Sequence, residues 1–387
     1  MQDITYFART NFRSGGRLFG IRRADRLSHI YVIGKTGAGK STLFETIMRQ
    51  DLENGEGFAL LDPHGDLFEK INSAVPEARR AAVIAWDVTD LSSPIRFNPL
   101  SGVEPEKRSL AVAGLIAAFE RQWHDSWGVR MEHVLRNTLF ALLEAGGATL
   151  ADIPRLLEVD SFRREVIARV ANKQARGFFE REYESYAPSM RAQVIGPILN
   201  KVGAFLADPT LYHILVSPEN SFDLRRLMDS GGVLLVNLSK GKIGEGPASL
   251  LGSLLVASIG LAGLSRAELP VERRRPFFVY LDEFQSFATL SLAGMLSELR
   301  KYGVGLILAN QYLGQLSPEI RDAVLGNVGT LIAFRVGAAD APLLAREFAP
   351  VFGAEDLLSL PNRSIYLKLL VDGVVSRPFS AETITPR

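Results

Sequence analysis

The sequence contains no cysteine. Disulfide bonds, zinc sites with cysteine ligands and iron–sulfur clusters are therefore excluded, which suits a cytoplasmic protein. An excess of one charge is also missing, because 44 basic residues nearly balance 43 acidic residues and leave a formal net charge of +1. Bulk charge thus gives no sign of a nucleic-acid partner, and any basic surface has to be local.

Long uninterrupted hydrophobic runs are absent too. The longest apolar stretch, residues 250–264, is broken by three glycines and two serines, so we expect a buried helix and no membrane span. Residues 1–5 do not resemble a signal peptide. The 387 residues are 47% hydrophobic and 22% charged, which is typical of a globular protein with one large core or two domains.

One stretch carries a specific chemical pattern. Residues 34–41, GKTGAGKS, fit the Walker A pattern G-x-x-x-x-G-K-[ST] and follow an apolar run, residues 30–33, that predicts a strand. Apolar residues at helical spacing continue from residue 42 to residue 53. Glycines let backbone N–H groups approach phosphate oxygens, and the start of a helix favours an anion. The pattern therefore predicts that the chain binds and hydrolyses a nucleoside triphosphate.

The residues of this loop have distinct expected roles. We expect Lys40 to bridge the β- and γ-phosphates and the Ser41 hydroxyl to hold Mg²⁺. The residues that the pattern predicts to contact the nucleotide are Gly34, Thr36, Gly37, Ala38, Gly39, Lys40, Ser41 and Thr42. Loss of the Lys40 charge is expected to abolish hydrolysis.

A second motif completes this site. Residues 277–283, FFVYLDE, have the pattern of a buried strand that ends in two acids. We expect Asp282 to hold Mg²⁺, directly or through water, and Glu283 to polarise the attacking water. The next apolar run ends in Ala-Asn-Gln. Gln311 is our candidate sensor of the γ-phosphate and the lytic water, with Asn310 as the second choice or as a turn residue.

Short apolar runs alternate with helical stretches in both the first and the last part of the sequence, which predicts βαβ units and a parallel sheet. The predicted strands are residues 30–33, 58–61, 81–86, 233–238, 277–281, 304–308, 330–336 and 365–370. Between them, the pattern is almost entirely helical. We therefore expect a nucleotide-binding motor domain from residues 1–104 and 213–387, interrupted by an all-α insertion at residues 105–212.

The glutamate directly after Asp282, together with a strand inserted between the two motifs, indicates a RecA-like α/β core with a mostly parallel sheet. ATPases of this class commonly work as rings in which an arginine of one subunit reaches the γ-phosphate held by the next. Arg300 is our first candidate for this arginine and Arg335 the second. For either residue, pairing with a helix dipole remains the alternative.

Basic stretches are the candidate contacts to DNA. If the chain forms a ring motor, Lys240 and Lys242, flanked by glycines, suit a loop that holds a phosphate backbone without regard to sequence. Basic residues of the insertion or the arginines at 273–275 suit such a loop as well. The alternative is that they are solvated charges. Residues 1–27 are polar and basic, and we favour a solvated lead-in over an arm that contacts DNA or a neighbouring subunit.

Five motifs in order carry a family resemblance. They are residues 34–41, 62–66 (DPHGD), 97–100 (FNPL), 281–284 (LDEF) and 309–311 (ANQ). In this order they resemble the FtsK/HerA superfamily, and within it the conjugative coupling ATPases of type IV secretion, the TraG/TraD group. The resemblance covers nearly the whole chain. It implies a RecA-like motor with an inserted all-α domain, a hexameric ring, and ATP-driven movement of DNA through a central channel.

The resemblance also bears on single residues and on location. It favours Arg300 as the arginine that reaches the next subunit, and it places Asp62 and His64 beside the nucleotide. Coupling proteins usually carry N-terminal transmembrane helices, and this sequence shows none. We therefore expect a cytoplasmic motor that is recruited to the inner membrane by a membrane or secretion-channel protein. The DNA that it moves is single- or double-stranded.

Two alternatives remain open on the sequence. One is a HerA-like DNA translocase that works with a nuclease in repair or phage defence. The other is a nucleotide-gated scaffold that recruits effector proteins through the α-helical insertion. The near-neutral charge is the best support for the scaffold.

Overall fold

The computed structural model describes residues 3–12, 16–92 and 95–386. The chain divides into two compact units, of which the first comprises Met1–Asp87, Arg225–Ser239 and Arg266–Arg387. The second comprises Val88–Leu224 and Lys240–Ser265. The expected insertion, residues 105–212, falls inside this second unit, which is larger than expected.

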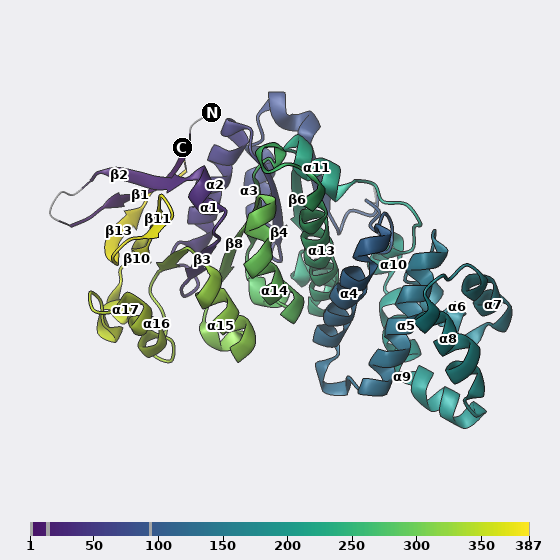
Figure 1. Cartoon of the computed structure of the whole chain (residues 1–387). Helices are drawn as coiled ribbons and strands as arrows, with labels where there is room; N and C mark the ends of the chain where they lie inside the picture. Colours follow the sequence, from purple (N-terminus) through teal and green to yellow (C-terminus); the bar gives the residue numbers. More distant parts are fainter. Residues whose placement is uncertain (1–2, 13–15, 93–94, 387) are drawn as a thin grey trace. The chain divides into compact units, whose positions relative to one another are not determined.

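Eleven strands within the described residues of the first unit form one sheet, in the order β2-β1-β13-β10-β9-β3-β8-β7-β4-β6-β5. Figure 1 labels β1, β2, β3, β4, β6, β8, β10 and β13 of this sheet. The seven strands from β9 to β5 run parallel, and antiparallel pairs add β10, β13, β1 and β2. The strands are β1 (Ile4–Thr10), β2 (Leu18–Arg22), β3 (Ile30–Ile33), β4 (Gly57–Asp62), β5 (Val83–Asp87), β6 (Val233–Asn237), β7 (Phe277–Leu281), β8 (Val304–Asn310), β9 (Thr330–Ala333), β10 (Ser364–Lys368) and β13 (Phe379–Thr383). The prediction of a mostly parallel α/β core is confirmed.

Helices of the first unit have apolar faces, which they bury in the core that they share with the sheet. They are α1 (Arg23–Arg26), α2 (Lys40–Asn54), α3 (Asp66–Ser73), α14 (Leu290–Glu298), α15 (Pro318–Asn327), α16 (Ala341–Phe348) and α17 (Ala354–Ser359), with α11 (Leu224–Ser230) at the boundary of the unit. Alternate strand residues such as Ile30 and Val32 share one core with Leu43 and Ile47 of α2. A hairpin of β11 (Leu370–Val371) and β12 (Val374–Val375) forms a separate two-stranded sheet.

The N-terminal stretch differs from the solvated lead-in that its charge predicts. It forms β1, β2 and α1, and Arg26 is only 1% exposed. The Arg26 guanidinium donates to both carboxylate oxygens of Asp51, at 2.6 and 2.7 Å, and to the Tyr280 hydroxyl at 2.6 Å. Paired and hydrogen-bonded in this way, a charge is tolerated in a core. The network joins α2 to β7, so the two elements that carry the nucleotide motifs are held together. Residues 13–15 of this stretch lie outside the described part.

The second unit is helical. Its helices are α4 (Arg108–Gln122), α5 (Val129–Ala145), α6 (Asp152–Glu158), α7 (Asp160–Ala168), α8 (Lys173–Gly177), α9 (Pro188–Leu206), α10 (Pro209–Leu215), α12 (Lys240–Ile243) and α13 (Glu245–Ser265). No strand occurs among its described residues. The unit exceeds the predicted 105–212 because the Phe97 N–H donates to the Ile214 carbonyl at 2.9 Å, and because α13 packs against α4.

The apolar helix α13 corrects one argument from the sequence. Together with the turn that follows, Glu245–Glu268 is long and apolar enough to cross a membrane, whereas the interrupted apolar run had suggested that it was not. In the described chain, 67% of its most apolar window is buried. Burial of this kind is typical of a core helix in a globular protein.

Candidate active site

The loop between β3 and α2 requires glycine at particular positions. Gly37 has φ 76° and Gly39 has φ 126°, a conformation that favours glycine. A Cβ on Gly39 would lie 2.9 Å from the ring of Phe334, and one on Gly34 would lie 2.5 Å from the Phe334 Cβ. Gly34 and Gly39 therefore pack against Phe334, where a larger residue would collide with it.

Helix α2 begins directly after this loop. No side chain caps its first turn, and that turn contains no acidic residue. The first N–H groups of a helix have no partner within the helix, and together with the helix dipole they favour an anion. The beginning of α2 and the glycine cradle thus fit a phosphate group, as the sequence pattern predicts.

Lys40 is held inside this cradle. Its side chain is buried, and Nζ donates to the Gly34 carbonyl oxygen at 2.6 Å. Burial lowers the pKa of Lys40, while the nearby Glu283 and Asp282 carboxylates act in the opposite direction. The Lys40 ammonium is bonded only to loop carbonyls. A negatively charged phosphate oxygen that replaced these carbonyls would accept a stronger, charge-assisted hydrogen bond.

A cavity of about 410 Å³ opens beside the loop. It is lined by Thr36, Gly37, Gly39, Lys40, Ser41, Thr42, Asp62, His64, Asp66, Leu67, Lys70, Asp282, Glu283 and Gln311. Among the described residues that the sequence singled out for catalysis and nucleotide contact, the lining omits Gly34, Ala38 and Arg300. The first two shape the loop from behind, because the Lys35 carbonyl accepts the Ala38 N–H at 3.2 Å and Gly34 lies against Phe334.

The order of the strands places Asp282 and Glu283 at the cavity. β8 lies between β3 and β7, so the ends of all three parallel strands meet at one edge of the sheet. Asp282 is 7% exposed, and burial, together with the charges of Asp62 and Glu283, raises its pKa to about 7. A buried carboxylate beside other acids is stabilised by a cation. With the Ser41 hydroxyl on the same cavity, the oxygen ligands fit Mg²⁺.

This raised pKa predicts how stability responds to Asp282→Asn. Because the folded-state pKa exceeds the unfolded value, the stabilisation from this group is full at low pH and is lost as the pH rises toward about 7. At pH 8 without nucleotide, the variant should be more stable than the wild type by an amount on the order of a few kcal/mol. Thermal unfolding between pH 4 and 8 measures this, and the difference should narrow toward pH 4.

The control is Asp66→Asn, which changes an exposed carboxylate on the same cavity and should alter the melting temperature little at any pH. A lower stability of Asp282→Asn than of wild type at pH 8 would contradict the claim that the buried, ionised Asp282 carboxylate destabilises the folded protein.

Asp62 has a structural task at the cavity wall. Its carboxylate accepts the backbone N–H groups of His64, Leu67 and Phe68, each at 2.9 Å, and so caps the start of α3. The cap directs α3 so that Lys70 lines the cavity. The sequence analysis placed Asp62 and His64 here but overlooked Lys70, because Asp62 precedes the N-cap of α3, Gly65, and its capping contacts are not visible in the sequence.

Glutamine side chains surround Glu283. Nε2 of Gln311 donates to Oε1 of Glu283 at 2.9 Å, and Nε2 of Gln285 donates to Oε2 at 2.6 Å. Asn310 is instead fixed in the core, where its amide accepts from the Tyr31 hydroxyl at 2.7 Å and donates to a backbone carbonyl. Gln311 thus lies where the sequence predicts a sensor, and Asn310 supports it. Gln285 was not among the predicted site residues.

The two candidate arginines lie at opposite ends of the parallel strands. Arg300 is exposed and lies in the 3-10 turn Leu299–Tyr302, just before β8, and Gln311 follows the other end of that strand. The seven residues of β8 separate Arg300 from the cavity of its own chain by roughly 20 Å. Arg335 lies at the P-loop edge, where its carbonyl accepts the Lys35 N–H at 2.9 Å and its guanidinium donates to Asn362. Arg300 therefore does not reach the cavity of its own chain, whereas Arg335 lies beside it.

The candidate DNA contacts are altered by the structure. Lys240 and Lys242 belong to the short helix α12 and not to the loop that their flanking glycines suggest. Arg274 donates to the carbonyls of Leu269 and Lys301, and Arg275 donates to the carbonyls of Ser230 and Gly55. These two arginines therefore hold backbone together, which competes with binding to DNA.

Comparison with known proteins places this arrangement in a wider group. A family model described as the type IV secretion-system coupling protein DNA-binding domain matches residues 19–364. No curated protein sequence matches the chain significantly.

Several solved structures share the fold. The unbound bacterial conjugative coupling protein TrwBdeltaN70 has 16% identity and a TM-score of 0.70, over 95% of this chain and 88% of that one. The plasmid coupling protein TrwB in complex with ADP and Mg²⁺ has 15% identity and a TM-score of 0.70, over 100% and 96%. VirB4 of Thermoanaerobacter pseudethanolicus has 17% identity and a TM-score of 0.63, over 100% and 97%.

These similarities confirm the predicted fold, and the family match confirms the resemblance to coupling proteins. All five motifs that pointed to this group lie within the matched residues 19–364. The chain belongs to the family of the type IV secretion-system coupling protein DNA-binding domain.

Proposed function

We propose that the chain is an ATP-driven motor that translocates DNA, works as a hexameric ring and hydrolyses ATP where two subunits meet. One observation carries the proposal: the glycine cradle, Lys40, two buried acids and Gln311 converge on one cavity. They do so in a chain of the coupling-protein family.

The residues divide the work of phosphoryl transfer. The loop N–H groups and Lys40 hold the phosphates of ATP, and Ser41 and Asp282 hold Mg²⁺. When bound, Mg²⁺ neutralises charge on the phosphate oxygens. The Glu283 carboxylate accepts a proton from the attacking water, and Gln311 contacts both that water and the γ-phosphate. Each of these residues lines the cavity.

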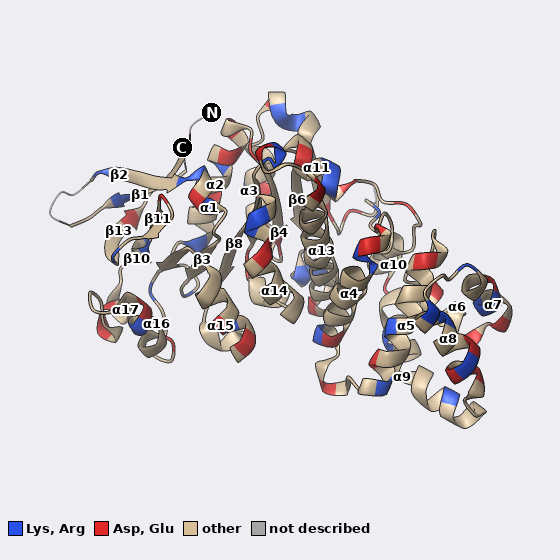
Figure 2. Ribbon diagram, viewed as in Figure 1, with Lys and Arg blue, Asp and Glu red and all other residues tan. Residues whose placement is uncertain are grey.

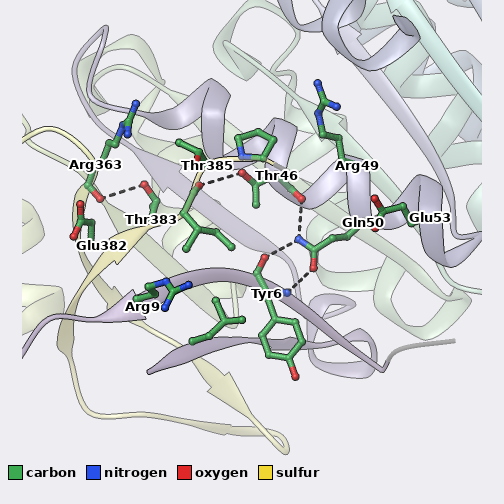
Figure 3. Close-up of a pocket in the computed structure, with 13 residues that line it drawn as sticks. Tyr6, Arg9, Thr46, Arg49, Gln50, Glu53, Arg363, Glu382, Thr383 and Thr385 are labelled. Atoms are coloured by element: carbon green, nitrogen blue, oxygen red, sulfur yellow. Dashed lines mark hydrogen bonds between the residues drawn. The ribbon is translucent and has the colours of Figure 1, made fainter. Parts of the chain in front are cut away.

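A second cavity, of about 700 Å³, suits the nucleoside end of ATP (Figure 3). Thr46 and Gln50 of α2 line it and continue the helix face that starts with Thr42 in the first cavity. One helical turn advances about 5.4 Å, so ribose and base beyond the α-phosphate would reach it. Arg363 lines it as well, and its N–H donates to the Ala38 carbonyl in the P-loop at 3.0 Å.

The ring proposal assigns Arg300 to the active site of the neighbouring subunit. Arg300→Ala is expected to lower ATP hydrolysis by about a hundredfold, because a fixed cation no longer stabilises the transition state. Mixing Arg300→Ala protein with Lys40→Ala protein should restore activity, since some interfaces then combine an intact Arg300 with an intact Lys40. Steady-state hydrolysis across mixing ratios measures the recovery.

Arg321→Ala is the matched control. Arg321 lies on the surface helix α15 and should behave as wild type. If the mixture has only the summed activities of the two variants, Arg300 does not act across an interface.

DNA binding in this proposal depends on local charge. Lys and Arg are interspersed with Asp and Glu on the described ribbon (Figure 2), and the net charge is +1. Contacts to the phosphate backbone would be few, weak and sensitive to salt, which suits a motor that releases each contact. The motor works in the cytoplasm, and a membrane or secretion-channel protein recruits it to the inner membrane.

One observation favours a second function, the nucleotide-gated scaffold. Arg274 and Arg275 are engaged with backbone carbonyls, which leaves fewer basic side chains for DNA. A scaffold would hydrolyse ATP at a rate independent of DNA and would bind DNA weakly without salt dependence.

A further inference from the structure

Glu283 is held from two sides by amides from different elements. Gln311 follows the end of β8 and lines the cavity. Gln285 belongs to the 3-10 turn Phe284–Ser286 and is not one of the described residues that line the cavity. Their Nε2 atoms donate to different oxygens of the same carboxylate, at 2.9 and 2.6 Å. The Glu283 side chain therefore has a fixed orientation before any substrate arrives.

The backbone is shaped to make the second contact. Glu283 has φ 46° and ψ 48°, a left-handed conformation that is strained for a residue with a side chain. The turn that follows is fixed, because the Ser286 N–H donates to the Glu283 carbonyl at 2.8 Å and Phe284 is buried with its ring against Tyr31. Strain of this kind persists only when the surroundings determine it. Here it brings the Gln285 amide back toward the glutamate.

We propose that Gln285 is a positioning residue for hydrolysis. Its amide holds the Glu283 carboxylate from the side away from the cavity, so that the carboxylate faces the attacking water. Each carboxylate oxygen can accept more than one hydrogen bond, so both amides leave room for the water. Proximity and orientation of a general base affect the chemical step far more than ground-state binding. This inference rests on the proposed ATPase function.

A purely structural role makes a different prediction. A hydrogen bond between side chains two residues apart also stabilises a turn, and its loss would lower stability and affect every ligand alike. A positioning role acts on the transition state only. The two roles are therefore separated by comparing ligands that mimic the ground state with ligands that mimic the transition state.

The test uses Gln285→Met, which keeps the side-chain length and removes the amide, and Gln285→Glu, which keeps the shape and replaces the donor with an acidic group. We expect both to lower kcat at least about tenfold with KM within about twofold. Binding of ADP with Mg²⁺ and aluminium tetrafluoride, which mimics the transition state, should weaken by a similar factor. Binding of ADP with Mg²⁺ and beryllium trifluoride should not change.

Thr289→Ala is the matched control. Its hydroxyl accepts the Leu292 N–H at 3.3 Å in the same segment and does not touch Glu283, so this variant should lower the melting temperature without separating the two fluoride complexes. A wild-type kcat in both Gln285 variants, or equal weakening of both complexes, would overturn the positioning role alone. Absence of hydrolysis in the wild-type protein would overturn the ATPase function and this inference with it.

Discussion

Lys40→Ala is expected to lower ATP hydrolysis by about a thousandfold or more. Nζ of Lys40 is the buried cation of the P-loop, and it is bonded only to loop carbonyls at 2.6 and 3.4 Å. Without it, the P-loop loses the buried cation that stabilises the negative charge developing on the β- and γ-phosphates during transfer. Steady-state hydrolysis of ATP by the purified variant measures the loss.

The neighbouring Lys35 provides a matched control, because it belongs to the same loop but has an exposed side chain that does not line the described cavity. Lys35→Ala should keep hydrolysis within about twofold of wild type, as expected for a surface substitution. Equal activity of Lys40→Ala and wild type would show that ATP is hydrolysed elsewhere.

Glu283→Gln is expected to lower kcat by about a thousandfold while nucleotide binding remains close to wild type. The amide keeps the size of the side chain but accepts a proton poorly, so only the activation of water is lost. Because the substitution places three amides together, the hydrogen bonds from Gln285 and Gln311 will rearrange, which adds to the loss. Equilibrium binding of a non-hydrolysable ATP analogue and steady-state hydrolysis separate the two effects.

Glu69→Gln is the control for this substitution. Glu69 is an exposed residue of α3 that does not line the cavity, so kcat should stay within about twofold of wild type. Hydrolysis by Glu283→Gln at more than a tenth of the wild-type rate would remove Glu283 from the role of general base.

The sequence allowed the central site to be predicted because its parts are local patterns. A glycine loop between a strand and a helix, and two acids after a buried strand, each follow from a few consecutive residues. The strand order that brings them together follows from the strand inserted between the motifs. Lys40, Asp282 and Gln311 accordingly line one cavity.

Features that depend on distant partners were not predictable in the same way. Arg26 looked solvated, and only the approach of Asp51 and Tyr280 explains its burial. β1 was missed because its polar and basic surroundings suggested a solvated segment, and one of its two pairing partners, β13, lies near the other end of the chain. Gln285 gave no signal, because its contact with Glu283 depends on a left-handed backbone turn that a sequence pattern does not reveal.

The measurement that tests the central claim most directly is ATP hydrolysis by the wild-type protein without DNA, with single-stranded DNA and with double-stranded DNA, each across a salt series. A DNA-translocating motor predicts strong stimulation that fades as salt rises, because contacts to the phosphate backbone weaken with salt. The more effective form of DNA would identify the substrate. Hydrolysis that is the same with and without DNA at every salt concentration would contradict the motor and favour the scaffold.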